Sequence, residues 1–130
     1  MLGKIISIKS DETFFPLTYG YFEGISVTTD KHKFLVGIEM GQSCCENYGY
    51  LTSEDIPSEH IGANLLSVEV VDGDLKTIDI EDSTDMRAMF VNFKTSVGTY
   101  QVVVYNEHNG YYGHEVVIVK NGVVEHEETL

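Results

Sequence analysis

Positive charge is scarce in this sequence of 130 residues. Eight Lys and Arg residues face 21 Asp and Glu residues, so the formal net charge is -13 at pH 7. A protein that holds a nucleic-acid backbone replaces the counterions of the phosphates with Lys and Arg side chains. An anionic membrane attracts the same residues. Direct binding to nucleic acid or to a membrane is therefore disfavoured, whereas a positively charged protein surface would attract this chain.

Long apolar runs are also absent. Apolar runs such as residues 35–38 and 102–104 fall far short of the roughly 20 residues that span a bilayer. The first ten residues alternate apolar and polar side chains, which indicates a strand rather than a secretion signal. We therefore expect one cytoplasmic domain over residues 1–130, in which residues 125–130 form a frayed acidic tail.

Cysteine is rare, and the two cysteines present, Cys44 and Cys45, are neighbours. Neighbouring side chains of a strand point to opposite faces, and zinc ligands are usually two or more residues apart. Glu46 disfavours the thiolate that a nucleophilic cysteine requires. We interpret the pair as small packing groups at a strand end. A zinc site completed by His side chains and a nucleophilic thiol are the alternatives.

Alternation of apolar and polar residues runs through most of the chain and predicts half-buried strands. Asn121-Gly122 joins two β-rich segments and suits the positive φ angles of a two-residue hairpin turn. Pro57 and Gly62 delimit one short helical turn. The sequence predicts a mainly β fold, at the margin of α+β, with one antiparallel, hairpin-rich sheet or a partly open barrel and one or two short helices. The expected strands cover residues 4–9, 24–30, 34–40, 65–72, 75–80, 86–93, 99–105, 115–120 and 123–127.

Residues 72–85 form an acidic stretch in which Lys76 is the single cation. The stretch is not an EF-hand loop, because the position that requires Gly is Thr77 when counting starts at Asp72. Its charges suit a solvated hairpin edge that resists edge-to-edge pairing. They also suit a strip of carboxylates that accepts hydrogen bonds from Arg and Lys of a partner. The candidate partner-binding carboxylates are those of Asp72, Asp74, Asp79, Glu81, Asp82 and Asp85.

A second candidate segment covers residues 106–116, where Tyr111 and Tyr112 follow a Gly-containing turn. Tyr supplies large amphipathic contact area at interfaces, so both are candidate partner-binding residues. His108 and His114 beside carboxylates offer a general acid or base. Tight turns recruit Asn-Gly for backbone reasons alone, however, and a purely structural turn is the simplest interpretation.

Two motifs together resemble a known family. The first is Ser-Cys-Cys-Glu at residues 43–46, followed by a short predicted helix that ends in Ile61-Gly62 and by a strand. The second is the Asn-Gly-Tyr-Tyr turn at residues 109–112. In this order, over roughly residues 34–119, the sequence is similar to a family of small uncharacterised proteins from bacteria and their phages. The resemblance implies a compact β-rich domain of phage or mobile-element origin, and it implies no activity.

Charge, aromatic content and resemblance together predict a non-enzymatic acidic protein that binds and inhibits a host defence protein. We expect it to mimic the charge of a nucleic acid on the basic surface of a nuclease, as an anti-CRISPR-type inhibitor would, with no cofactor and no metal. One alternative is a small-ligand sponge that sequesters a nucleotide immune signal, for which a homo-oligomer is possible. A second alternative is a metal-dependent hydrolase that uses His108 and His114.

Overall fold

The computed structural model describes residues 2–15, 21–40, 47–52, 57–73, 86–107 and 114–130. This part of the chain forms nine strands and one short 3-10 helix, η1, which covers Pro57–His60. The strands are β1 (Ile5–Phe14), β2 (Phe22–Thr29), β3 (Lys33–Glu39), β4 (Asn47–Thr52), β5 (Leu65–Gly73), β6 (Met86–Thr95), β7 (Gly98–Glu107), β8 (Glu115–Lys120) and β9 (Val123–Thr129).

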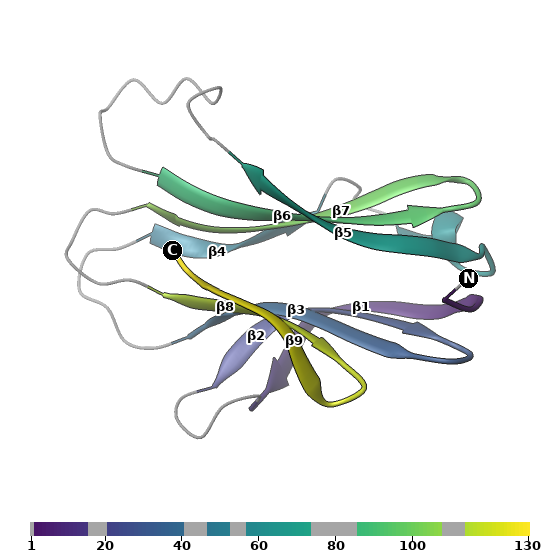
Figure 1. The fold of residues 1–130 in the computed structure, drawn as a ribbon, viewed down its shortest axis with the longest axis horizontal. Coiled ribbons are helices and arrows are strands. Elements are labelled where there is room, and N and C mark those ends of the chain that lie inside the picture. Colours follow the sequence, from purple (N-terminus) through teal and green to yellow (C-terminus); the bar gives the residue numbers. More distant parts are fainter. Residues whose placement is uncertain (1, 16–20, 41–46, 53–56, 74–85, 108–113) are drawn as a thin grey trace.

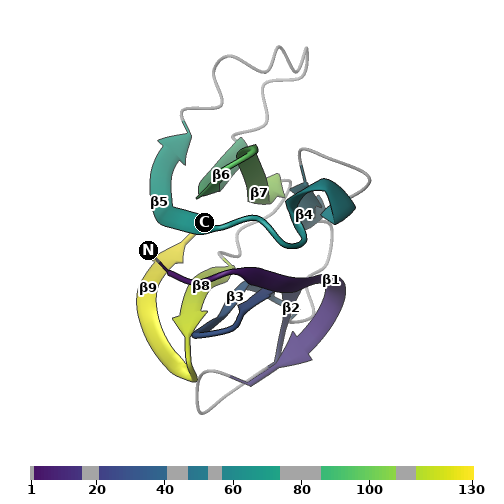
Figure 2. The same ribbon diagram turned by 90° about the vertical axis from the view of Figure 1, so that its right-hand side faces the viewer.

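The strands form two antiparallel sheets that face each other as a sandwich (Figures 1 and 2). The five-stranded sheet has the order β1-β2-β3-β8-β9, and the four-stranded sheet has the order β4-β7-β6-β5. The chain changes sheets between β3 and β4 and again between β7 and β8, whereas η1 connects two strands of the four-stranded sheet. Each sheet therefore contains strands from both halves of the sequence.

The main core lies between the two sheets and is built from the inward side chains of alternating residues. Val36 of β3, Val91 of β6 and Val102 of β7 are completely buried there. The rings of Phe34 and Phe93 cross from opposite sheets with centroids 6.1 Å apart and an interplanar angle of 75°. Such edge-to-face pairs add to the stabilisation from burial itself.

A smaller core lies on the outer face of the five-stranded sheet. Phe22, Val117 and Val119 are buried there, and they pack with the half-buried side chains of Phe14, Leu35 and Val124. Gly24 permits the close approach of β2 and β3 on this face, because a Cβ atom at position 24 would collide with the carbonyl oxygen of Val36. The five-stranded sheet thus covers the apolar residues on its outer face with its own edge strands.

The mainly β class, the antiparallel hairpins and the short helical turn are confirmed. Asn121 and Gly122 have φ angles of 52° and 82° in the turn between β8 and β9, as the hairpin prediction requires. The strands divide into two sheets, where one sheet or a partly open barrel was expected, because alternation along a strand does not specify its neighbours. The expected strand at residues 75–80 lies outside the described residues.

The prediction of a frayed tail over residues 125–130 is wrong. Residues 125–129 belong to β9, which pairs with β8. Leu130 is buried and exchanges two backbone hydrogen bonds with His114, at 2.8 and 2.9 Å. The exposed Glu125 and Glu127 alternate with half-buried residues, so an acidic composition does not prevent an edge strand. Among the described residues, no helix has the length and apolar character to cross a membrane.

A glycine exchange tests the close contact between β2 and β3. We expect Gly24→Ala to lower the free energy of unfolding by about 3 kcal/mol, because the added methyl group must displace backbone. Gly49→Ala in β4 is the matched control. Its Cβ would lie 3.2 Å from the mobile hydroxyl end of Tyr105, and we expect a cost below about 1 kcal/mol. If urea unfolding shows equal losses in the free energy of unfolding for the two variants, Gly24 has no special role in the contact between β2 and β3.

Candidate binding surfaces

Most of the residues predicted to bind a partner lie outside the described residues. This holds for Asp74, Asp79, Glu81, Asp82, Asp85, Tyr111 and Tyr112, and also for the pair Cys44-Cys45 and for His108. Asp72 belongs to β5, but its side chain is likewise outside the described part. Their roles as partner contacts therefore stay predictions.

The strand ends that flank these residues lie together at one end of the sandwich, which we call the loop end (Figure 1). The register places Glu107 of β7 opposite both Asn47 of β4 and Met86 of β6. Gly73, the last residue of β5, lies opposite Ala88 of the same β6. The acidic stretch connects β5 to β6, and the segment with Tyr111 and Tyr112 connects β7 to β8. Both predicted contact segments are thus attached to neighbouring strands.

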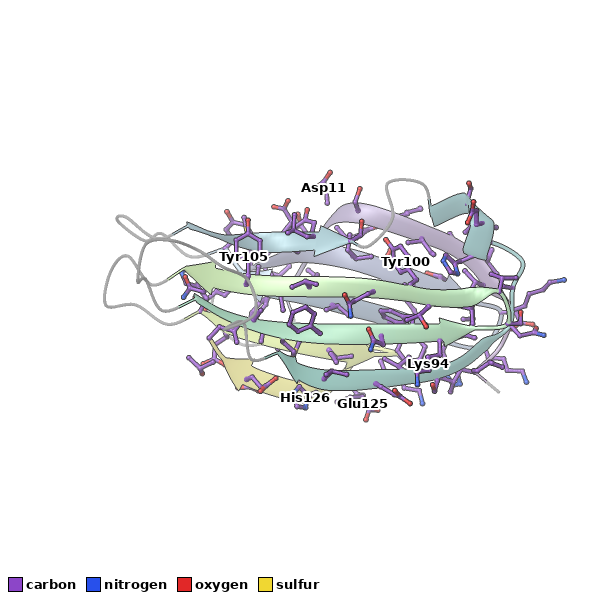
Figure 3. All side chains as sticks on the ribbon, turned by 90° about the horizontal axis from the view of Figure 1, so that it is seen from above. Asp11, Lys94, Tyr100, Tyr105, Glu125 and His126 are labelled. Atoms are coloured by element: carbon purple, nitrogen blue, oxygen red, sulfur yellow. The ribbon has the colours of Figure 1, made fainter. Side chains whose placement is uncertain are left out.

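Lysines gather at the opposite end, which we call the turn end. Lys31 lies in the β2–β3 turn, Lys33 is the first residue of β3, and Lys120 is the last residue of β8. The backbone of Lys33 donates to Asn121 Oδ1 at 2.9 Å, and the backbone of Lys4 donates to Asp30 Oδ1 at 2.8 Å, which ties these turns together. Lys94, near the end of β6, also lies here (Figure 3).

These lysines are little neutralised by neighbouring carboxylates. Glu69 Oε2 lies 3.0 Å from Lys94 Nζ, and both side chains are about half exposed. Within the described residues this is the single ion pair between a lysine and a carboxylate. The described lysines are therefore concentrated at the turn end, opposite the end at which β5 ends and β6 begins, whereas Arg87 lies near the start of β6.

Tyr50 links the two sheets at the side formed by β1 and β4. Its hydroxyl donates toward the carboxylate of Asp11 on β1 and toward Glu23 Oε1 on β2, the latter at 3.0 Å. Asp11 adopts a φ of 59° next to an irregularity in the pairing of β1 with β2. Partial burial, together with these two carboxylates, raises the pKa of Tyr50. The phenol therefore keeps its proton and acts as a hydrogen-bond donor, not as a base.

The edge strands β5 and β9 lie at the opposite side of the sandwich (Figure 2). Residues of these and neighbouring strands line a groove of about 340 Å³. Five apolar and three ionisable side chains line it, and the ammonium of Lys120 lies 5.9 Å from the centroid of the Phe34 ring. His126 Nε2 lies 2.9 Å from Glu128 Oε2. The volume is at the lower end of the range for small-molecule sites. The lining residues are Leu2, Phe34, Val68, Val70, Ile118, Lys120, Glu125 and His126.

His114, a candidate acid or base in the hydrolase alternative, is integrated into the fold. Its side chain is 3% exposed, and Nδ1 lies 3.0 Å from the carbonyl oxygen of Glu39. Its backbone pairs with that of Leu130. In the part of the chain that the structure describes, no group of three or more His, Cys, Asp or Glu side chains is placed to hold a metal ion.

Sequence patterns did not indicate the Tyr50 contact or the groove. The groove draws residues from the N-terminus, β3, β5, β8 and β9, and no local spacing connects positions so far apart in the chain. Tyr50 lies in β4, a strand of six residues without a clear alternation. Its partners on β1 and β2 follow from sheet packing alone.

Residues 1–118 match the family described as a domain of unknown function (DUF7448). The match covers most of the chain, so the chain belongs to this family, and membership in an uncharacterised domain family is confirmed. No curated protein and no solved structure matches the chain.

The raised pKa of Tyr50 predicts a pH-dependent contribution to stability. A phenol that holds its proton more tightly in the folded state stabilises it fully below the unfolded pKa of about 10, and loses this contribution as pH rises further. We expect Tyr50→Phe to lower the free energy of unfolding by about 1–3 kcal/mol at pH 7. Above about pH 10, the difference between wild type and variant should shrink. Urea unfolding across this range measures it, and a constant difference would contradict the prediction.

Proposed function

We propose that this member of the DUF7448 family is a non-enzymatic, acidic binding protein from a phage or mobile element. In the cytoplasm of the host cell it would occupy a positively charged surface of a defence protein, such as the nucleic-acid groove of a nuclease. Its carboxylates would there accept the hydrogen bonds that Arg and Lys otherwise give to phosphates. Occupation of that surface would inhibit the defence protein by excluding its nucleic acid.

Charge segregation is the observation that carries this proposal. The described lysines lie mostly at the turn end, whereas the acidic stretch connects β5 to β6 at the loop end. With a net charge of -13, the molecule is attracted to cationic surfaces as a whole. The distribution of its cations orients the loop end toward such a surface during approach.

The segment with Tyr111 and Tyr112 follows β7 in the sequence, next to the strand that the acidic stretch precedes. β6 pairs with β5 on one side and with β7 on the other, so the acidic stretch and the segment of Tyr111 and Tyr112 leave neighbouring strands. Carboxylates steer encounter over a Debye length of about 8 Å at physiological salt. Desolvated aromatic side chains supply most of the affinity in many protein interfaces. The two segments would then have complementary roles in one interface.

Salt dependence and carboxylate removal test this proposal. We expect a partner captured from host lysate at low salt to elute as the salt concentration rises. Asp79→Asn combined with Asp82→Asn should weaken its affinity at least about tenfold, because hydrogen bonds to charged groups contribute about 1.5–3 kcal/mol each.

The matched control is Glu59→Gln combined with Glu127→Gln, which removes the same charge at η1 and β9. Only the long-range attraction between the protein and its partner should then change. We therefore expect this variant to bind the partner with an affinity within about threefold of wild type. Titration calorimetry at several salt concentrations measures both variants. Affinity that is flat from low to high salt would contradict charge mimicry.

A second candidate, the small-ligand sponge, is favoured by the groove between β5 and β9. Its apolar walls and the Lys120 ammonium above the Phe34 ring suit a ligand with a flat apolar body and an anionic group, such as a nucleotide.

For this candidate we expect mass spectrometry to detect a nucleotide released from heat-denatured protein. Lys120→Met should reduce its occupancy about tenfold, because one charge-assisted contact is lost. A nucleotide recovered in stoichiometric amount would replace the first proposal, and protein that releases none would contradict the second.

A further inference from the structure

An apolar row crosses the outer face of the four-stranded sheet. Its members are direct neighbours in the register, since Leu51 of β4 lies opposite Val103 of β7, which lies opposite Phe90 of β6, which lies opposite Val71 of β5. Leu51 is 58% exposed and Val71 is 45% exposed, while Val103 and Phe90 between them are half-buried. Four apolar side chains therefore form one continuous surface across the whole sheet.

The two sheets differ in whether the apolar side chains on their outer faces are covered. The five-stranded sheet buries the apolar side chains on its outer face, as Phe22, Val117 and Val119 show. The four-stranded sheet leaves its apolar row in contact with solvent. An exposed contiguous apolar patch on a protein of otherwise acidic surface is typical of an interaction site.

Polar and aromatic groups border the apolar row on its two sides. Toward the loop end, the ring of Tyr105 lies over Gly49, whose Cβ would be 3.2 Å from the Tyr105 hydroxyl (Figure 3). Toward the turn end, Gln101 Nε2 donates to Asn92 Oδ1 at 2.8 Å, and the Glu69–Lys94 ion pair follows. The face thus has an apolar centre and a polar margin, as protein interfaces do.

We propose that this face packs against the same face of a second copy of the chain, about a two-fold axis that runs along the apolar row. In such an isologous interface each member of the row meets its own counterpart. The row lies at mid-strand, because Val103 is central in β7 (Gly98–Glu107) and Phe90 is central in β6 (Met86–Thr95). Rotation about this axis reverses the strands, so the turn end of each protomer faces the loop end of the other.

Matching margins point to a second copy as the occupant. The reversal places the Tyr105 side of one face against the Gln101 and Asn92 side of the other. Hydrogen-bonding groups then face one another on both sides of the apolar row, and the row is covered without a further partner.

The area of the face is sufficient for a weak dimer. The four strands contain six, nine, ten and ten residues. At about 3.4 Å per residue and about 4.8 Å between strands, they present a face of roughly 570 Å². Two such faces bury about 1,100 Å², the size of weak, reversible interfaces. Sheets stack face to face in the same way inside sandwich proteins, at about 10 Å. We therefore infer a reversible dimer, whose net repulsion weakens as salt screens the charges.

Sedimentation equilibrium of the full chain tests this inference. We expect wild type to approach twice the chain mass of 14.6 kDa as concentration rises, and to dimerise more tightly at high salt. Leu51→Glu and Val71→Glu should each weaken dimerisation at least about 100-fold, because two like charges meet across the axis. Val123→Glu is the control, since Val123 is 63% exposed on the other sheet, and it should dimerise like wild type.

A mixture of two variants tests the direction of the axis. Leu51 would meet its own counterpart, so Leu51→Glu mixed with Leu51→Lys should restore a dimer, whereas Leu51→Glu mixed with Val71→Lys should not. Circular dichroism confirms that each variant is folded. Wild type that stays monomeric at every concentration and salt, or a dimer that tolerates both Glu substitutions, would overturn the proposal. Recovery in the second mixture would overturn the proposed axis.

Discussion

Close packing of two inner sheet faces is the constraint on which the rest of this structure depends. Phe34 and Phe93 meet edge to face in the centre, and completely buried valines on β3, β6 and β7 surround them. Because interiors are packed as densely as organic crystals, the spacing of the sheets is fixed by these side chains. The positions of the edge strands follow from that spacing, and so do the distances across both open sides of the sandwich.

The two open sides are closed by different means. At the β1 and β4 side, the Tyr50 hydroxyl spans the sheets and binds carboxylates of Asp11 and Glu23. At the β5 and β9 side, residues near the N-terminus pair with the start of β5, where Leu2 N donates to the carbonyl oxygen of Leu65 at 2.9 Å. Next to this contact lies the groove that Lys120 helps to line. One open side is therefore closed by the polar contacts of Tyr50, and the other contains a groove with space for a ligand.

The strand order also decides how charge is distributed. The turns that carry Lys31, Lys33 and Lys120 lie at one end of the sandwich, whereas β5 ends and β6 begins at the other, and the acidic stretch connects these two strands in the sequence. This arrangement supports the proposed association with a cationic partner, whereas the proposed dimer depends on the apolar row. The two associations respond to salt in opposite directions, because screening weakens attraction between unlike molecules and reduces repulsion between like ones.

The sequence by itself determined the β class, most strand positions, the Asn121-Gly122 hairpin and the scarcity of cations. These properties are local or compositional, since alternation, turn chemistry and charge depend on neighbouring residues alone. It did not indicate β4 or that residues 125–129 form β9, because short or acidic edge strands lack a clear alternation. Only the tertiary structure decided which strands share a sheet. This strand arrangement placed Tyr50 beside Asp11 and formed the groove near Lys120. It also aligned the apolar row of Leu51, Val103, Phe90 and Val71. These contacts join residues far apart in the chain, and pairing between distant strands depends on the packing of the whole core rather than on any local pattern.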